Sequence, residues 1–253
     1  MTQTCRDQLL MGERTLSQGT HAGLMLYFYL QDDSDKARSS LLDCTRQAPK
    51  AAKKMYQNKF NLFKQCLPRH SISTLVKVDG RAVIGLGVES PLETGLTLHH
   101  TYGVPYIPGS ALKGLASHFC AQVWGDHNED FRFDGKYHDV LFGTTERSGY
   151  IVFNDGWLSP ESLTSCLGKD VMAVHHPNYY KADNDSPPSD FDDPNPIIFL
   201  SVQGSFLLSV HCNVSDDSGK AWAKLSMKLI LDALENWGIG AKTSAGYGRM
   251  IKA

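Results

Sequence analysis

The residues best suited to chemistry lie where a segment rich in proline and glycine runs into a helical pattern. The segment IPGSALKG, residues 107–114, places Gly109, Ser110 and Lys113 where the helix is expected to begin. Ser110 predicts an N-cap. Free amides, the positive end of the helix dipole and an ammonium group would then converge on one point and favour an anion such as phosphate. The alternative is an ordinary helix start that binds nothing, and the local sequence alone slightly favours it.

A second candidate anion site lies in the glycine-rich tail. The sequence NWGIGAKTSAGYGR, residues 236–249, surrounds Lys242 and two hydroxyl side chains with glycines and ends on Arg249. Backbone amides in such a loop can cradle phosphate oxygens, and Tyr247 or the distant Tyr106 could stack on a base. The segment is no P-loop, because it follows a helical pattern and lacks the required spacing. The alternative is that the glycines only permit tight packing and that Lys242 and Arg249 point to solvent.

Histidines are the side chains to consider for a nuclease, because imidazole can act as base and acid near neutral pH. Two adjacent pairs occur, His99-His100 and His175-His176. Neighbours in a strand point in opposite directions, so each pair offers at most one ring to a given site. The alternative, which we favour, is a structural histidine that is hydrogen-bonded in a loop.

No metal site or cofactor is predicted. The acidic segment 126–139 lacks the spacing of a calcium-binding loop, so we interpret it as a solvated loop or a surface for a neighbouring subunit. Six scattered cysteines without a C-x-x-C pair indicate reduced thiols in a cytoplasmic protein, and we expect Cys66 and Cys120 to be buried. No apolar run is long enough to span a bilayer, so no membrane association is expected.

The charges are unevenly distributed, although the net charge is only −2. Residues 1–70 contain 11 Lys and Arg against 6 Asp and Glu, whereas residues 120–220 contain 6 against 16. Residues 221–253 are basic again, with 5 against 2. This asymmetry suits a subunit with one side facing RNA and another facing protein, and it also suits any protein with uneven solvated faces.

The hydrophobic periodicity predicts an α+β fold with helices on one face of an antiparallel sheet. We expect helices over 35–47, 51–67, 109–123, 159–167 and 220–237, and strands over 72–78, 81–87, 149–157, 196–202, 205–212 and 247–252. Asp79-Gly80 predicts a hairpin between the first two strands. A helical N-terminal extension, residues 1–70, would pack on a main domain of residues 71–253 that carries long loop insertions. The order of elements is compatible with a ferredoxin-like arrangement.

Taken together, the motifs resemble a known family. IPGSALKG followed far downstream by GIGAKTSAGYGR is similar to the helix-opening motif and the C-terminal glycine-rich loop of the RAMP superfamily of CRISPR-associated RNA-binding proteins. Further segments resemble the sixth-subunit family of the type III-B effector, the Cmr complex; they are ESPLETGLTLHHTYGVPYIPGS, LFGTTERSGYIVFND, VMAVHHPNYY and PNPIIFLSV. The resemblance is close from about residue 85 to residue 249 and loose before it.

The resemblance implies an RRM-like RAMP domain that binds RNA without cutting it. The implied partners are the guide RNA near its 3′ part, the other Cmr subunits on which the chain would stack, and target RNA as a further candidate; target cleavage in such complexes is assigned to another subunit. The expected RNA-binding residues are Gly109, Ser110, Lys113, Lys242, Thr243, Ser244, Tyr247 and Arg249. Two alternatives stay open. One is a metal-independent RAMP endoribonuclease that processes CRISPR repeat RNA through one of the histidines; the other is an assembly protein that never touches RNA.

Overall fold

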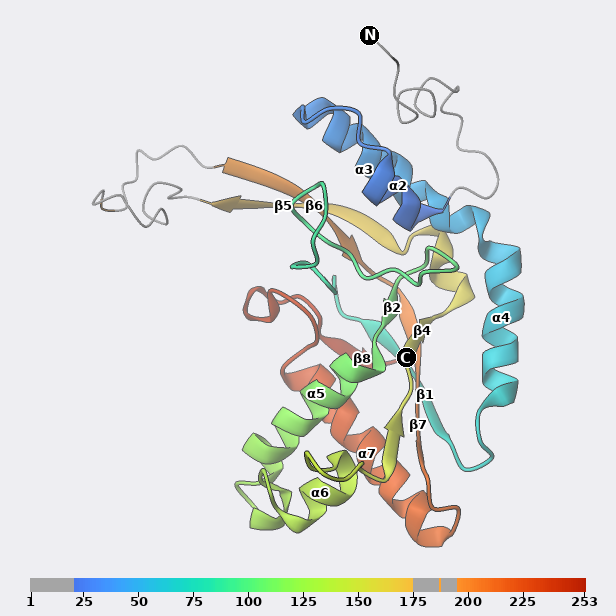
Figure 1. Cartoon of the computed structure of the whole chain (residues 1–253), viewed down its shortest axis with the longest axis vertical. Helices are drawn as coiled ribbons and strands as arrows, with labels where there is room; N and C mark the ends of the chain where they lie inside the picture. Colours follow the sequence, from blue (N-terminus) through green and yellow to red (C-terminus); the bar gives the residue numbers. More distant parts are fainter. Residues whose placement is uncertain (1–20, 175–186, 188–194) are drawn as a thin grey trace.

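The computed structural model describes residues 21–174, 187 and 195–253, which combine helices with β-strands (Figure 1). The helices are α2 (Ala22–Phe28), α3 (Asp35–Ala51), α4 (Lys53–Cys66), α5 (Gly109–Phe119), α6 (Lys136–Phe142) and α7 (Asp217–Asn236). The strands are β1 (Ile72–Val78), β2 (Tyr106–Ile107), β3 (Ile151–Phe153), β4 (Gly156–Leu158), β5 (Leu167–Val174), β6 (Asn195–Val202), β7 (Ser205–Cys212) and β8 (Met250–Lys252). One π-helical turn (Cys120–Trp124) and three 3₁₀ turns (Glu129–Phe131, Pro160–Thr164 and Thr243–Ala245) complete the order.

The main sheet is antiparallel, as the sequence predicts. Its strand order is β2-β4-β7-β1-β8, and β3 pairs with the far end of β7. Strand β7 therefore lies at the centre, with Val76 opposite Phe206 on one side and Leu158 opposite Phe206 on the other. A second, two-stranded sheet joins β5 to β6.

The predicted hairpin at Asp79-Gly80 is wrong. β1 pairs with β7 along one edge and with β8 along the other, so neither edge is left for the next segment. Gly80 has a φ of 77°, and the chain after it forms a single bridge between Ala82 and Val202 rather than a strand over 81–87. A turn signal identified the bend correctly, but it could not identify which strands compete for β1.

Helices α5 and α7 cover one face of the sheet, while α4 stands on its other side (Figure 1). Helix α7 buries a continuous apolar stripe against β7 and β1. On the other side, Tyr56 of α4 donates a hydrogen bond from its hydroxyl to the Leu158 carbonyl, at 2.8 Å. Its ring and that of Phe63 both stack on Trp157. Buried residues of α2, α3 and α4 thus belong to the same hydrophobic core as those of the sheet.

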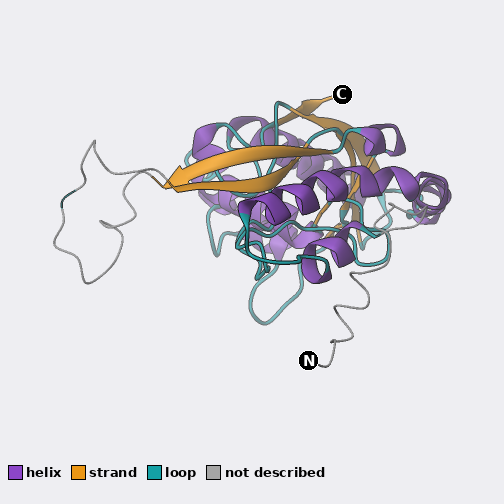
Figure 2. Cartoon of the chain, turned by 90° about the horizontal axis from the view of Figure 1, so that it is seen from above, coloured by secondary structure: helices purple, strands orange, loops and turns teal. Residues whose placement is uncertain are grey.

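The β5–β6 ribbon runs alongside α3, as Figure 2 shows. Lys169 of β5 reaches back to α3, where its ammonium lies 2.8 Å from the carboxylate of Asp43. Arg46 donates a hydrogen bond to the carbonyl of Leu167 at the base of the ribbon. The N-terminal helices therefore support the ribbon as well as the core.

Several predicted elements differ from the structure. The acidic segment 126–139, expected to be a solvated loop or a docking surface, contains a 3₁₀ turn and the first residues of α6, a helix that buries Leu141 and Phe142 at its end. The expected strand 149–157 is interrupted at residues 154–155, and the expected helix 159–167 is only a 3₁₀ turn leading into β5. Helix α3 continues through Pro49 instead of ending before it, and a further helix, α2, precedes it. Within the described residues, no helix combines the length and the apolar character needed to cross a bilayer.

Candidate nucleic-acid interface

The start of α5 is occupied by a carboxylate of the same chain. The Gly109 amide donates a hydrogen bond to Oδ1 of Asp155, at 2.7 Å. The capping position is Pro108, which itself offers no side-chain hydrogen bond, so the prediction that Ser110 is the N-cap is wrong; Ser110 lies exposed in the first turn. Because Asp155 already supplies a negative charge at the positive end of this helix, the predicted anion site there is satisfied internally.

The glycine at this helix start is explained by close packing. A Cβ on Gly109 would lie 2.3 Å from the Phe153 carbonyl oxygen of β3. Helix α5 therefore approaches the strand more closely than any residue with a side chain would permit. Its place in the motif is accounted for without a ligand.

Lys113 is exposed, but it lies on the α6 side of α5. His138 is a buried residue of α6, and its pKa is lowered mainly by burial. The charge of Lys113 also lowers the pKa of His138. One turn further along α5, Ser117 hydrogen-bonds to Nε2 of the same histidine at 2.9 Å. With 100° between successive helical residues, Ala111 and Leu115 face nearly the opposite direction from Lys113.

The glycine-rich tail forms a closed loop after α7. The Ile239 amide donates to the Gly248 carbonyl at 2.9 Å, and the Gly248 amide donates to the Arg81 carbonyl at 2.8 Å. Gly248 has a φ of 79°, and a Cβ there would lie 2.0 Å from the Ile239 carbonyl oxygen. Lys242 also adopts the left-handed conformation, with a φ of 60°. The alternative that glycines serve tight packing thus accounts for much of this loop.

An open groove lies between this loop and α5. Its volume is about 560 Å³, and its lining combines the outer face of α5 with the loop. The lining residues are Ala111, Leu115, Asn236, Trp237, Gly238, Ile239, Gly240, Thr243, Ser244 and Arg249. Two hydroxyls and one exposed guanidinium thus face a partly apolar groove that has no acidic residue in its lining. Of the predicted residues, the structure brings together Thr243, Ser244 and Arg249; Gly109, Ser110, Lys113, Lys242 and Tyr247 are not part of the lining.

Tyr247 is held by contacts within the chain. Its hydroxyl donates to Oδ2 of Asp170 on β5 at 3.2 Å, and its ring packs against Phe199 of β6. Burial, followed by the nearby carboxylate of Asp170, raises the pKa of Tyr247. Arg81 approaches the same carboxylate at 3.8 Å and donates to the Ser201 hydroxyl. Asp170 and Arg81, which the sequence did not single out, thus tie the glycine-rich loop to the β5–β6 ribbon.

The described histidine pair is divided between two environments. His99 is half-buried, with its ring centroid 4.4 Å from that of Tyr102 and its edge toward Tyr106. Its Nδ1 accepts a hydrogen bond from the Thr101 amide, and burial lowers its pKa. His100 is exposed, so the two rings do not form one site. The pair His175-His176 lies outside the described residues.

The chain offers no metal centre within its described part, where no group of three potential ligands comes together. The described cysteines are free thiols. Burial raises the pKa of Cys120 to about 12, which keeps its thiol protonated and unreactive at neutral pH. Cys66 is exposed at the end of α4, so the expectation that it is buried was wrong.

Comparison with known proteins identifies the family. The family model described as the RAMP superfamily matches residues 76–251. The CRISPR system Cmr subunit Cmr6 of Pyrococcus furiosus is 30% identical, over 79% of this chain and 72% of that protein. The corresponding Cmr6 subunit of Saccharolobus solfataricus is 25% identical, over 66% of this chain and 52% of its own length.

A solved structure shows the same fold. It is a chain in a cryo-EM structure of the type III-B Cmr-beta bound to cognate target RNA, with a TM-score of 0.65 and 20% identity, covering 88% of this chain and 77% of that one. The family match extends from within β1 to within β8 and includes both sides of the groove. The chain therefore belongs to the RAMP superfamily and, within it, to the Cmr6 family.

Proposed function

We propose that this chain is a non-catalytic RNA-binding subunit of a type III-B CRISPR (Cmr) ribonucleoprotein. It binds the guide RNA near its 3′ part and stacks on the other RAMP subunits of the complex. Target RNA is a further partner, because the Cmr-beta complex that contains the similar chain is bound to cognate target RNA. The support is membership of the Cmr6 family together with one local observation, the groove between α5 and the glycine-rich loop.

The groove suits an RNA backbone because of its chemistry. Arg249 supplies a cation, the hydroxyls of Thr243 and Ser244 can donate to phosphate oxygens, and Trp237 offers an apolar floor. Contacts of this kind position a strand without reading its sequence, which a subunit that accepts any guide requires. Few cations converge here, so we expect the isolated chain to bind RNA weakly and with a modest dependence on salt.

We extend the proposal to the finer architecture. The order β8-β1-β7-β4, with α5 after β1 and α7 after β7, fits the ferredoxin-like split β-α-β arrangement. The division into an extension over 1–70 and a RAMP domain over 71–253 agrees with a family match that begins at residue 76. Free thiols in the described part favour a reducing compartment, so we place the complex in the cytoplasm.

The test is retention of guide RNA by the assembled complex. The full chain, co-expressed with the other subunits and a guide RNA, is compared with Arg249→Glu and with Arg147→Glu, an exposed arginine away from the groove. We expect Arg249→Glu to lower the guide RNA recovered per complex and Arg147→Glu to leave it unchanged. Equal recovery from all three would exclude the groove as an RNA contact.

The same preparations separate binding from cleavage. Guide RNA incubated with the complex in EDTA should stay intact on a denaturing gel, because the described histidine pair is divided between a packed ring and an exposed one. A discrete EDTA-resistant cut that disappears in His99→Ala or His100→Ala would instead favour the processing nuclease.

A further inference from the structure

A basic region surrounds the elbow between α3 and α4. From residue 44 to residue 78 the chain contains eight Lys and Arg and no Asp or Glu. The whole chain, in contrast, has 25 Lys and Arg and 27 Asp and Glu. Four of these lysines lie on α4, which has no acidic residue. Such segregation in a chain of net charge −2 concentrates positive potential on one side of the molecule.

Helix α4 leaves most of its surface open to solvent. It fully buries only Tyr56 and Phe60, and all four of its lysines are exposed. Apart from Phe63, which packs against the core, the side chains on the other faces of the helix are free to serve another purpose.

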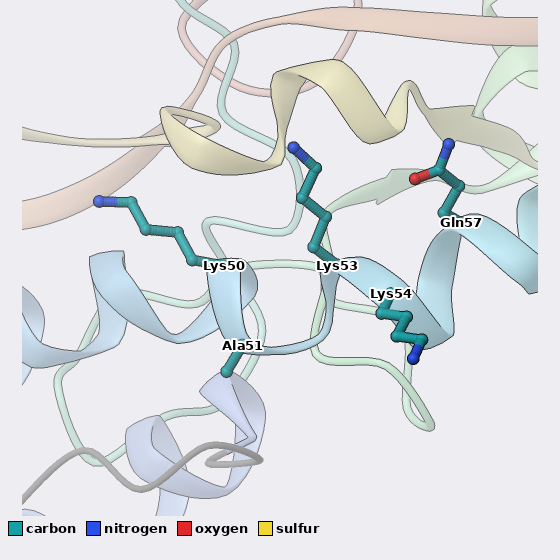
Figure 3. A pocket seen from close by; sticks show the side chains of 5 residues that line it. All are labelled: Lys50, Ala51, Lys53, Lys54 and Gln57. Carbon is teal, nitrogen blue, oxygen red and sulfur yellow. The ribbon is translucent and has the colours of Figure 1, made fainter.

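The elbow itself forms an open hollow of about 550 Å³, lined by Lys50, Ala51, Lys53, Lys54 and Gln57. Figure 3 shows Lys53 and Gln57 pointing toward the 3₁₀ turn at Pro160–Thr164, Lys50 pointing along α3 and Lys54 pointing to the opposite side. Two ammonium groups and one amide therefore line an open hollow that can take an anionic group.

The beginning of α4 adds to this positive charge instead of balancing it. Its N-cap is Ala52, which offers no side-chain hydrogen bond, and its first turn holds Lys53 and Lys54 and no acidic residue. Cations at the positive end of a helix dipole are unfavourable unless an anion is present. Lysine at both positions is thus a local cost that a bound phosphate would offset.

Few groups within the described chain neutralise the elbow. Lys50 hydrogen-bonds to the Gln47 side chain at 2.6 Å, and neither Lys53 nor Lys54 is among the ion pairs of the described residues. The carboxylate that faces it is Glu161, whose pKa is lowered mainly by the Ser159 hydroxyl and less by Lys53 and Lys64. One carboxylate engaged by a hydroxyl leaves the elbow with a net positive charge.

We infer that this elbow, formed by Lys50, Lys53 and Gln57, is a second binding site for RNA phosphate, separate from the groove. The inference rests on the proposed RNA-binding function and adds a surface to it. An RNA backbone fits better than a protein partner, because the hollow is lined by lysine stems and polar tips and has no aromatic anchor of the kind that dominates protein interfaces. The elbow lies outside the matched residues 76–251 and on a different side of the molecule from the glycine-rich loop (Figure 1).

The salt dependence of RNA binding tests this inference. The full-length chain is titrated with a fluorescein-labelled 30-nucleotide poly(U) RNA at several salt concentrations, and the affinity is read from fluorescence anisotropy. The variant is Lys50→Gln with Lys53→Gln; the matched control is Lys220→Gln with Lys224→Gln, two exposed lysines of α7. Each lost phosphate contact to a single strand should reduce the steepness of log K against log salt by about 0.7. The elbow variant lacks two lysines, so its slope should be about 1.4 shallower than that of the unmodified chain, and the slope of the control should be unchanged.

Three results overturn the inference, and each is distinct from failure of the proposed function. A slope unchanged in the elbow variant, with the unfolding curve of the unmodified chain, shows that no phosphate is bound there; so does an unmodified chain that binds no poly(U). In both cases the guide-retention test with Arg249→Glu still decides the proposed function. If the elbow variant instead weakens assembly of the subunits without RNA and keeps the full slope, the occupant is an acidic protein segment and the inference is wrong.

Discussion

The start of α5 and the glycine-rich loop look alike in sequence and differ in the folded chain. Each combines glycine, lysine and hydroxyl side chains in a short span. At α5, Asp155 accepts the Gly109 hydrogen bond and supplies the negative charge that the helix end favours. At the loop, Arg249, Thr243 and Ser244 face a groove whose lining contains no acidic residue.

The difference shows that an anion site depends on which carboxylates the fold brings close as much as on the motif itself. Asp155 lies 46 residues from Gly109 in sequence, in the break between β3 and β4. The lining of the groove has no such carboxylate, and the contact of the loop with the Asp170 carboxylate, through Tyr247, faces the β5–β6 ribbon. A ligand therefore competes with an internal carboxylate at α5 and with none in the groove.

The largest effect expected is on the fold of the glycine-rich loop. Gly248→Ala should lower the free energy of unfolding by roughly 3 kcal/mol or more, because the new Cβ would meet the Ile239 carbonyl oxygen in a left-handed backbone conformation. Gly246→Ala is the matched control: its φ is 87°, but no atom lies within 4 Å of the added Cβ. It should cost about 1 kcal/mol, the price of the conformation alone.

Urea denaturation followed by circular dichroism measures both variants. Equal losses would show that the loop tolerates a side chain at Gly248 and that its closure is weaker than the contacts indicate. The glycine-rich loop would then be flexible, and its glycines would serve mobility rather than packing.

RNA binding should separate the two regions next. Arg249→Glu should weaken binding of single-stranded RNA on the order of tenfold at low salt, because it reverses the one cation in the groove lining. Lys113→Glu should change it by less than about twofold, since Lys113 lies on the opposite side of α5. Fluorescence anisotropy at matched salt gives both values, and a larger effect from Lys113→Glu would reverse the comparison.

The internal carboxylate can be removed directly. Asp155→Ala should destabilise the protein by about 1 kcal/mol, the usual cost of losing a helix cap. It should leave RNA affinity equal or slightly higher, because it removes a negative charge beside α5. Asn154→Ala serves as the neighbouring control, since the Asn154 side chain hydrogen-bonds to the Ser209 carbonyl and not to α5. A loss of RNA affinity in Asp155→Ala alone would mean that α5 must be capped before RNA can bind.

Much of the fold could be predicted from the sequence because local periodicity determines it. The helix expected at 51–67 is α4 over Lys53–Cys66, and the strands expected at 72–78 and 205–212 are β1 and β7 with those bounds. Ser34 caps α3 as its type suggests, because its hydroxyl accepts a 3.2 Å hydrogen bond from the Ala37 amide. In each case the signal lies within one turn or one strand.

The site could be predicted only in part, because its decisive contacts join distant residues. Asp155 falls within the strand that the sequence predicted over 149–157, and nothing in the sequence connects it to α5. Arg81 lies 120 residues from Ser201, and no spacing rule relates the two. The hairpin at Asp79-Gly80 failed for the same reason, since β8, at the end of the chain, takes the edge of β1 that the hairpin would have used.

The smallest effect expected concerns the hydrogen bond between Tyr247 and Asp170, which joins the loop to the β5–β6 ribbon. Tyr247→Phe removes the hydrogen bond to Asp170 and should cost roughly 0.5 kcal/mol at neutral pH, because the pair is only partly buried. The contact also predicts how the stability of the protein depends on pH. The pKa of Tyr247 is raised by burial and by Asp170, so above its ordinary value near 10 the unfolded chain ionises before the folded one.

The stability due to neutral Tyr247 is therefore complete below pH 10 and is lost as the pH rises through the higher pKa of the folded state. Urea denaturation between pH 8 and about pH 11 should give a steeper decline for the unmodified chain than for Tyr247→Phe, and Tyr150→Phe, at an exposed tyrosine, should follow the unmodified chain. Curves for Tyr247→Phe and the unmodified chain that run parallel above pH 10 would show that Asp170 does not hold the Tyr247 hydroxyl. The loop would then be joined to the ribbon only through Arg81 and the ring of Phe199, and Tyr247 would be free to stack on a base.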